Sequence, residues 1–204
     1  MKLFLTLAIT AVSAVSLFAS SIPRTDVNAH GKVELDPAAV EGGFKVAHQN
    51  WGPKNSRAYR LTAAASKAIG DKWTLCKFAF TPKTAGQVGV FVGGQWAPKP
   101  EDRGWLAVSN IKVNGKLIPN GDFSKTVDKK GKTVPVSFWL SKNTTYAAKG
   151  GVNGANAMIV NHDNRIGFGL KVEAGKTITV EYMAKSAAAP AVKAAPAPAA
   201  KAAK

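Results

Sequence analysis

The sequence contains a single cysteine, Cys76, so no disulfide can form within one chain. Cys76 alternates with Phe78 and Phe80 in the segment WTLCKFAF, which predicts a buried position on a β-strand. A reactive thiol is the alternative interpretation of this residue. No cysteine stands near the end of the apolar leader, so the sequence gives no support for a lipid-modified N-terminus.

Acidic residues are also few, since 12 Asp and Glu stand against 28 Lys and Arg, and the formal net charge is +16. Of the basic residues, only Lys2, Lys193, Lys201 and Lys204 lie in the apolar leader or the C-terminal tail. The excess charge therefore belongs to the body of the protein. Such a field favours polyanions, namely acidic glycans, nucleic acid or an anionic cell surface, whereas the alternative is that the charge only keeps the protein soluble.

The motifs of common enzymes are missing. The chain has no Gly-x-Ser-x-Gly elbow and no His-Glu-x-x-His pair, and no motif singles out two carboxylates for glycoside hydrolysis. Its histidines, at positions 30, 48 and 162, are too scattered to suggest a zinc site. In NHDNR (161–165), His162 and Asp163 form either an acid–base pair or, as we favour, a hydrogen-bonded turn. We expect no enzyme and no cofactor.

Both ends of the chain have compositions unlike the body. Lys2 is followed by an apolar run from Leu3 to Phe18 and then by small residues, which predicts a signal peptide over residues 1–21. Cleavage between Ala19 and Ser21 would export the protein and leave the mature chain without a transmembrane span; a membrane anchor is the alternative. Residues 187–204 contain only Ala, Pro, Val and Lys, which predicts a disordered tail. Residues 22–186 remain as a single domain.

Apolar residues in the body alternate with a period of two, which predicts an all-β fold, an antiparallel sandwich or jelly roll. In VPVSFWLS (134–141), Val134, Val136, Phe138 and Leu140 fall on one side. A hairpin-length connection, AGK, separates the last two segments. Helical signals are limited to single turns, at 36–42 with Asp36 as cap and at 61–70, where a strand is the alternative. The alternating segments span 73–80, 86–94, 105–113, 134–141, 165–173 and 176–184.

The segment LIPNGDFS (117–124) resembles the opening of jelly-roll carbohydrate-binding modules with a galactose-binding-like fold. Asn120 to Phe123 match the opening phrase, and Pro135 and Trp139 follow as they do in that family. LKVEAGKTITVEYMAKS (170–186) resembles the last strands of the first half of such modules. KWTLCKFAFTP, GQVGVFVGG and WLAVSNIKVNG resemble the second half, but they lie upstream.

The resemblance covers about residues 59–186 and implies one jelly roll whose halves stand in permuted order. Permutation is physically reasonable because the termini of a domain often lie close together at the surface. Two degenerate half-domains are the alternative. Members of the family often hold a structural calcium ion, but Ser109, Asn110 and Ser124 stand where carboxylates are expected, and only Asp122 keeps its charge. The sequence therefore speaks against that calcium site.

Sugar recognition uses aromatic faces together with a few polar groups. Trp139 is out of phase with Phe138 and Leu140, so its ring is predicted to face away from the core, unless residues 22–57 pack over it. Trp51 and Trp96 lie in loops, where they either bind or cap the sandwich, whereas Trp73 and Trp105 begin strands and are predicted to be core residues. The predicted carbohydrate-binding residues are Trp139, Tyr146, Asn143, Asn161, Arg165 and Trp96.

Three functions remain open from the sequence. The first, implied by the resemblance, is a secreted non-catalytic module that binds a polysaccharide or a cell-surface glycan. The second is a structural envelope or surface protein in which the jelly roll binds no sugar. The third is a basic polyanion binder that uses lysine-rich segments such as KTVDKKGK (125–132). Salt dependence separates the third from the first, because polyanion binding falls steeply with salt.

Overall fold

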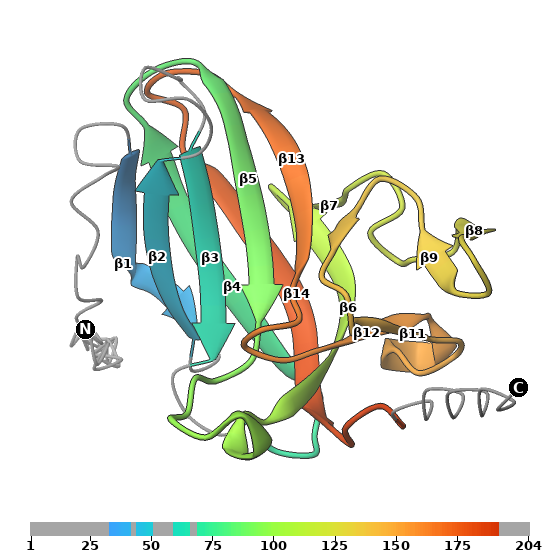
Figure 1. The fold of residues 1–204 in the computed structure, drawn as a ribbon. Coiled ribbons are helices and arrows are strands. Elements are labelled where there is room, and N and C mark those ends of the chain that lie inside the picture. The colour runs from blue at the N-terminus through green and yellow to red at the C-terminus, as the bar shows by residue number, and fades with distance from the viewer. Residues whose placement is uncertain (1–32, 42–43, 51–58, 66–68, 192–204) are drawn as a thin grey trace, which may run out of the picture.

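The computed structural model describes residues 33–41, 44–50, 59–65 and 69–191 (Figure 1). The predicted signal peptide and residues 192–204 of the predicted tail lie outside these ranges, as do His30 and Trp51. Two β-sheets pack face to face, and the prediction of an all-β sandwich is confirmed. Among the described residues, no helix has the length and apolar character needed to cross a membrane.

The larger sheet has seven strands and lies behind the smaller one in Figure 1. Six of them are hydrogen-bonded in the order β1-β4-β14-β6-β12-β11, and β7 pairs with β6. Every pairing in this sheet is antiparallel. The strands are β1 (Val33–Glu41), β4 (Thr74–Pro82), β6 (Trp105–Val113), β7 (Lys116–Leu117), β11 (Thr145–Ala147), β12 (Ala157–Val160) and β14 (Ile178–Ala187).

The smaller sheet has five strands in the order β10-β13-β5-β3-β2. The pairing of β3 with β5 is parallel, which the prediction of a purely antiparallel sandwich did not include, and the other three are antiparallel. β10 is an edge strand, on the opposite edge from β2. The strands are β2 (Phe44–Asn50), β3 (Tyr59–Ala65), β5 (Gly86–Gly93), β10 (Trp139–Leu140) and β13 (Ile166–Val172).

The core lies between the two sheets and follows the alternation in the sequence. Cys76, Phe78 and Phe80 of β4 are buried, as predicted, and so are the alternating valines of β5. Trp73 and Trp105 are only half-buried and do not belong to the core, so that prediction is wrong. The fully buried large side chains include Leu61, Phe78, Phe80, Ile111, Phe123, Met158, Ile166 and Tyr182.

Strands from both sides of Leu117 share each sheet. β14 lies between β4 and β6, and β13 pairs with β5, so the described strands do not separate into two bodies at residue 117. Ala187, the first residue of the predicted tail, is the last residue of β14 and stands opposite Trp105.

The AGK segment does not connect a hairpin, and that prediction is wrong. β13 belongs to the smaller sheet and β14 to the larger one, so the chain crosses from one sheet to the other here. The N–H of Gly175 donates to the carbonyl of Pro82, 2.8 Å away, and Gly175 has φ +73°, a conformation that favours glycine. A short glycine turn is therefore compatible both with a hairpin and with a crossing between sheets. The strands with which β13 and β14 pair decide which of the two connections forms.

Two further local predictions are corrected. Residues 36–41 of the predicted helical turn belong instead to the strand β1, whose register shifts between Asp36 and Glu41, and residue 42 lies outside the described ranges. The segment 134–141 is not one strand. β9 (Thr133–Pro135) pairs with β8 (Thr126–Asp128) in a separate hairpin, and Ser137, at φ +69°, lies between β9 and β10. Residues 59–65 form a strand, the alternative considered for 61–70.

Candidate functional site

Trp139 lies on the outer side of the smaller sheet, at the edge strand β10. Its neighbours Phe138 and Leu140 pack against the core, while 44% of the surface of Trp139 is exposed. The orientation predicted from the period of two is therefore confirmed. Of the described N-terminal strands, β1 is an edge strand of the larger sheet and β2 is an edge strand of the smaller sheet. β2 and Trp139 lie at opposite edges of the smaller sheet.

Trp139 forms an aromatic platform with Phe91 of β5. The two rings stack with centroids 5.9 Å apart and planes inclined by 17°. Their strands are separated by β13, which contributes Gly167 and Gly169 beneath them. A Cβ atom on Gly167 would lie 2.5 Å from Cε1 of Phe91, and one on Gly169 would lie 3.2 Å from Cη2 of Trp139. The position of the Phe91 ring therefore requires glycine at 167, whereas a side chain at 169 would be a tight contact for the Trp139 ring.

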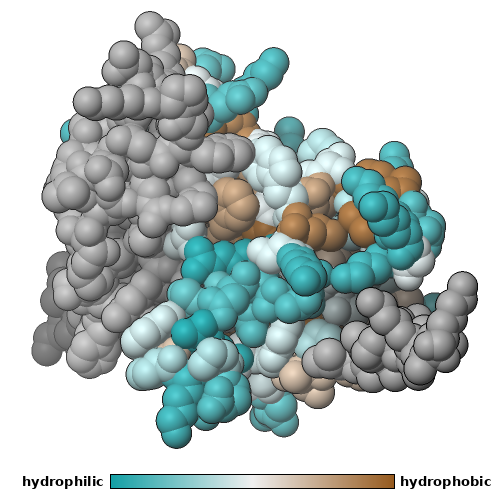
Figure 2. All heavy atoms as spheres, viewed as in Figure 1, coloured by the Kyte–Doolittle hydropathy of each residue, from teal (hydrophilic) through white to brown (hydrophobic). Residues whose placement is uncertain are grey.

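Figure 2 shows the molecule from the same side as Figure 1, in which the smaller sheet lies in front of the larger one. Hydrophobic residues reach the surface near the middle of this view, and hydrophilic residues lie below them and to the right.

Two adjoining hollows open beside the platform, and together they form what we call the basic groove. The hollow at Trp139 has a volume of about 410 Å³, and the one at Tyr146 has about 240 Å³. They share Lys132, Thr133 and Thr144, so they adjoin each other. The groove is lined by Lys129, Gly131, Lys132, Thr133, Val134, Phe138, Trp139, Leu140, Ser141, Lys142, Thr144, Thr145 and Tyr146.

Three lysines line the groove, and none of its lining residues is acidic. Lys129 and Lys132 belong to the turn of the β8–β9 hairpin, which projects from the sandwich at the right of Figure 1. Lys142 follows β10, and its carbonyl accepts a hydrogen bond of 3.0 Å from Nζ of Lys132. This contact connects the hairpin to the loop after β10 and closes one side of the groove.

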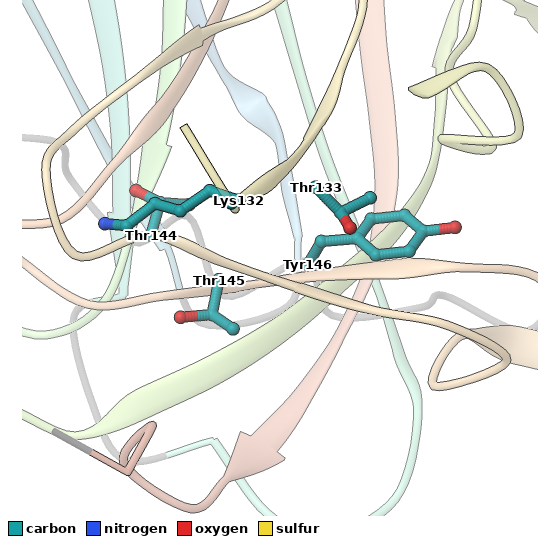
Figure 3. Close-up of a pocket in the computed structure, with 6 residues that line it drawn as sticks. Lys132, Thr133, Thr144, Thr145 and Tyr146 are labelled. Atoms are coloured by element: carbon teal, nitrogen blue, oxygen red, sulfur yellow. The ribbon is translucent and has the colours of Figure 1, made fainter. Parts of the chain in front are cut away.

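Tyr146 of β11 lies at the second hollow, and Asn143 precedes Thr144, which lines both hollows. Tyr146 is half-buried against the core and lines the hollow together with Lys132 and Thr133 (Figure 3). In that view the Lys132 amine and the Tyr146 hydroxyl point toward opposite ends of the hollow. Asn143 is exposed, and its backbone N–H donates to the side-chain oxygen of Asn164 at 3.2 Å.

Asn161 is 5% exposed and its side chain is used within a turn. Its amide oxygen accepts hydrogen bonds from the backbone N–H groups of Asp163 and Asn164, at 3.0 and 2.8 Å. Arg165 donates from Nε to the carbonyl of His162 at 2.5 Å. Neither Asn161 nor Arg165 lines the basic groove, but the main chain of Arg165 is hydrogen-bonded to Ser141, which does line it.

His162 and Asp163 do form a contact, with Nδ1 and a carboxylate oxygen 2.9 Å apart. The other ring nitrogen, Nε2, faces the Arg165 guanidinium at 3.1 Å, and the second carboxylate oxygen accepts from Arg103. The hydrogen bond with His162, and then that with Arg103, lowers the pKa of Asp163. This network connects the loop 161–165 to the loop before β6, and the favoured interpretation as a hydrogen-bonded turn matches its geometry.

Trp96 is the most exposed of the described large hydrophobic residues, at 57%. It lies in the loop between β5 and β6, which Arg103 holds by donating from Nε to the carbonyl of Ala97 at 2.8 Å. Trp96 does not line the basic groove. The predicted set is therefore divided: Trp139 and Tyr146 line the groove, Asn143 and Arg165 contact or adjoin residues that line it, and Asn161 and Trp96 are not among its lining residues.

The NGDFS segment packs beneath the groove and holds the hairpin β8–β9 and Phe138 in place. Asn120 donates from its side-chain nitrogen to the carbonyls of Lys125 and Val136, at 2.9 and 2.8 Å, and accepts from the N–H of Lys125 at 2.7 Å. Phe123 is completely buried, with its ring centroid 5.0 Å from that of Phe138, the neighbour of Trp139. The motif therefore holds both ends of the hairpin segment next to the core.

The residues of the calcium position have other partners. One oxygen of Asp122 accepts from the N–H and the hydroxyl of Ser124, at 3.1 and 2.9 Å, and the Ser109 hydroxyl donates to the carbonyl of Asn156. Within the described ranges, no group of three or more His, Cys, Asp or Glu side chains is arranged to hold a metal ion.

Sequence reasoning missed Phe91 and the threonines of the groove. Phe91 is out of phase with Val90 and Val92, the same signal that identified Trp139, and the Gly-x-Gly pattern at 167 and 169 indicated a place where side chains cross a strand. Thr133 and Thr144 carried no local signal, because the groove forms only when β9 lies beside β11.

Comparisons with family models, curated proteins and solved structures found no match for this chain.

Proposed function

We propose that the chain is an exported, non-catalytic carbohydrate-binding protein that recognises a polysaccharide or cell-surface glycan at the Trp139 platform and the basic groove. The stack of Trp139 on Phe91 is the observation that carries this proposal. A pyranose ring has an apolar face that packs on a flat aromatic surface, and a Trp that is 44% exposed offers such a surface.

Polar groups next to the platform suit the hydroxyls of a sugar. Thr133, Lys132 and Lys142 lie in the hollow that contains Trp139. That hollow, at about 410 Å³, has the size of a small-ligand site. The resemblance of the NGDFS and AGKTITVEYMAKS segments to jelly-roll carbohydrate-binding modules supports the same function, and the permuted order of the halves belongs to this proposal.

The test is a panel of polysaccharides screened by affinity electrophoresis with the parent and three variants. Trp139→Ala is expected to weaken binding about tenfold or more, since central aromatic residues dominate such interfaces. Trp139→Phe keeps a stacking ring and should retain most of the affinity. Trp96→Ala, which removes an equally large exposed ring outside the groove, is the matched control and should bind like the parent.

If Trp139→Ala binds the polysaccharide as tightly as the parent does, the binding site is not at the Trp139 platform. Failure of the parent to bind any polysaccharide would favour a structural envelope protein instead. Export is tested separately by the mass of the mature N-terminus, which is expected to begin between residues 20 and 22.

A further inference from the structure

The charged residues that line the basic groove are all positive. Lys129, Lys132 and Lys142 line it, no acidic residue does, and the described residues provide none of the three with an ion pair. The carboxylate nearest in sequence, Asp128, accepts the N–H of Gly131 at 3.1 Å and so serves the turn of the hairpin. A site of this kind attracts a negatively charged ligand.

The lysines are held by backbone structure rather than spread along a flexible segment. Reciprocal hydrogen bonds between the main chains of Lys129 and Lys132, at 2.9 and 3.2 Å, close the hairpin turn. Nζ of Lys132 then reaches the carbonyl of Lys142. Two segments of defined backbone therefore place three lysines on one groove next to the aromatic platform, and the Lys132 ammonium is itself held by a hydrogen bond.

The groove also offers two hollows rather than one. Trp139 lines one hollow, Tyr146 lines the other, and Lys132, Thr133 and Thr144 belong to both. Two adjoining hollows with an aromatic residue in each suit more than one unit of a polysaccharide chain.

Building on the function proposed above, we propose that the ligand is an acidic polysaccharide. One of its sugar rings stacks on Trp139, and its carboxylate or sulfate groups face Lys129, Lys132 and Lys142. Both anionic groups accept charge-assisted hydrogen bonds from ammonium groups, so the shared chemistry is a negatively charged glycan chain. A nucleic acid is a different class of ligand and is one outcome of the test.

The experiment compares four probes against the full-length mature protein by titration calorimetry at low and high salt. Polygalacturonate supplies carboxylates, and carboxyl-reduced polygalacturonate keeps the same backbone without them. Dextran sulfate supplies sulfates, and poly(dT) supplies phosphates and bases. We expect polygalacturonate or dextran sulfate to bind more tightly than the reduced polymer and than poly(dT), with an affinity that falls as salt rises.

Two triple variants separate a site from general attraction. Lys129→Gln, Lys132→Gln and Lys142→Gln together should weaken binding of the acidic polymer about tenfold or more, because each exposed contact contributes a small amount. Lys99→Gln, Lys112→Gln and Lys116→Gln together remove the same charge from exposed positions outside the groove and should change the affinity by less than about twofold. Thermal melting confirms that both variants are folded.

Each of the other outcomes would contradict the acidic ligand, the carbohydrate function or both. Equal binding of the reduced and acidic polymers, with loss in Trp139→Ala, would keep the carbohydrate function and overturn the acidic ligand. Equal weakening by both triple variants, with none in Trp139→Ala, would mean general charge attraction and overturn both proposals. Tightest binding to poly(dT), weakened by the groove variant, would assign the groove to nucleic acid. No binding to any probe would overturn the acidic ligand, and the polysaccharide panel then decides the carbohydrate function.

Discussion

Trp139 and Phe91 stack on each other although a strand lies between theirs. In register, Trp139 stands opposite Gly167 of β13, and Gly167 stands opposite Phe91 of β5. Any side chain at residue 167 would overlap the Phe91 ring, since an added Cβ would lie 2.5 Å from Cε1 of Phe91. The flat surface at the proposed site is therefore encoded by a glycine as much as by the two aromatic residues.

This relationship predicts the effect of Gly167→Ala. The added methyl group should push the Phe91 ring aside and separate it from Trp139, because close-packed rings cannot absorb such an overlap. We expect a changed near-ultraviolet circular dichroism signal, a loss of stability of about 1–3 kcal/mol and weaker glycan binding. Gly104→Ala, whose added Cβ would meet nothing within 4 Å, is the control. An unchanged aromatic signal in Gly167→Ala would contradict this account of the platform.

Much of the fold follows from the sequence because alternation reports burial directly. Cys76, Phe78 and Phe80, and Val88, Val90 and Val92, all lie in the core as their spacing predicts. Pairing partners are different, since they depend on residues far apart in the chain. The AGK turn was compatible with a hairpin, yet β13 and β14 belong to different sheets. The alternation across 134–141 also suggested one strand, and only the positive φ of Ser137 shows the break.

The candidate site was also predictable only where it depends on local alternation and not on contacts between distant residues. The outward face of Trp139 is a local property of its strand, and the sequence contains it. Asn161 and Arg165 were chosen as polar residues of a nearby loop, but the side chain of Asn161 closes that loop's own turn. Lys132, Thr133 and Thr144 meet only because the hairpin β8–β9 lies beside β11, a long-range contact without a sequence signal.

Cys76 is expected to be unreactive in the folded protein. Burial raises the pKa of its thiol to about 12, from an ordinary value of 9.0, so the reactive thiolate is about a thousandfold rarer at pH 8. Alkylation by iodoacetamide should be slow in buffer and fast in denaturant. The raised pKa also stabilises the fold below pH 9, and this contribution should be lost as the pH rises toward 12. Rapid alkylation of the native protein would show that Cys76 is accessible.

Asn120 should matter for stability out of proportion to its exposure. Its side chain makes three hydrogen bonds, to Lys125 twice and to Val136 once, and it adopts φ +61°, which Asn tolerates better than most residues. Asn120→Ala should cost about 2–4 kcal/mol in the free energy of unfolding, measured in urea, because it leaves backbone groups unpaired. Asn143→Ala removes an exposed amide and should change stability by less than about 0.5 kcal/mol.

Gly121, next in the same motif, tests whether this segment is structural. A Cβ atom here would lie 2.3 Å from the carbonyl oxygen of Ile111, a backbone atom that cannot move easily within β6. The N–H of Ile111 also donates to the carbonyl of Gly121 at 2.9 Å. Gly121→Ala should therefore destabilise the protein by about 3 kcal/mol or more and yield little soluble material. A Gly121→Ala protein that melts like the parent would contradict the close approach of these segments.

Asp163 is predicted to make the protein sensitive to acid. The hydrogen bonds with His162 and Arg103 lower the pKa of Asp163 below its ordinary value of 3.8, so the folded state favours the ionised carboxylate. The resulting stabilisation is present above that ordinary value and is lost as the pH falls through the lower folded value. Arg103 meanwhile holds the loop that contains Ala97, so this loop should loosen as Asp163 gains a proton.

Asp163→Asn removes the charge and should therefore flatten the dependence of the melting temperature on pH below the ordinary pKa of 3.8. At neutral pH the variant should melt below the parent, and the difference in melting temperature should shrink as the pH falls and the parent loses the same charge. Asp71→Asn provides the control, since Asp71 is an exposed carboxylate without an ion pair to any described residue, and it should follow the parent's curve. A constant difference between Asp163→Asn and the parent at every pH would show that the contact with Arg103 acts through packing and not through charge.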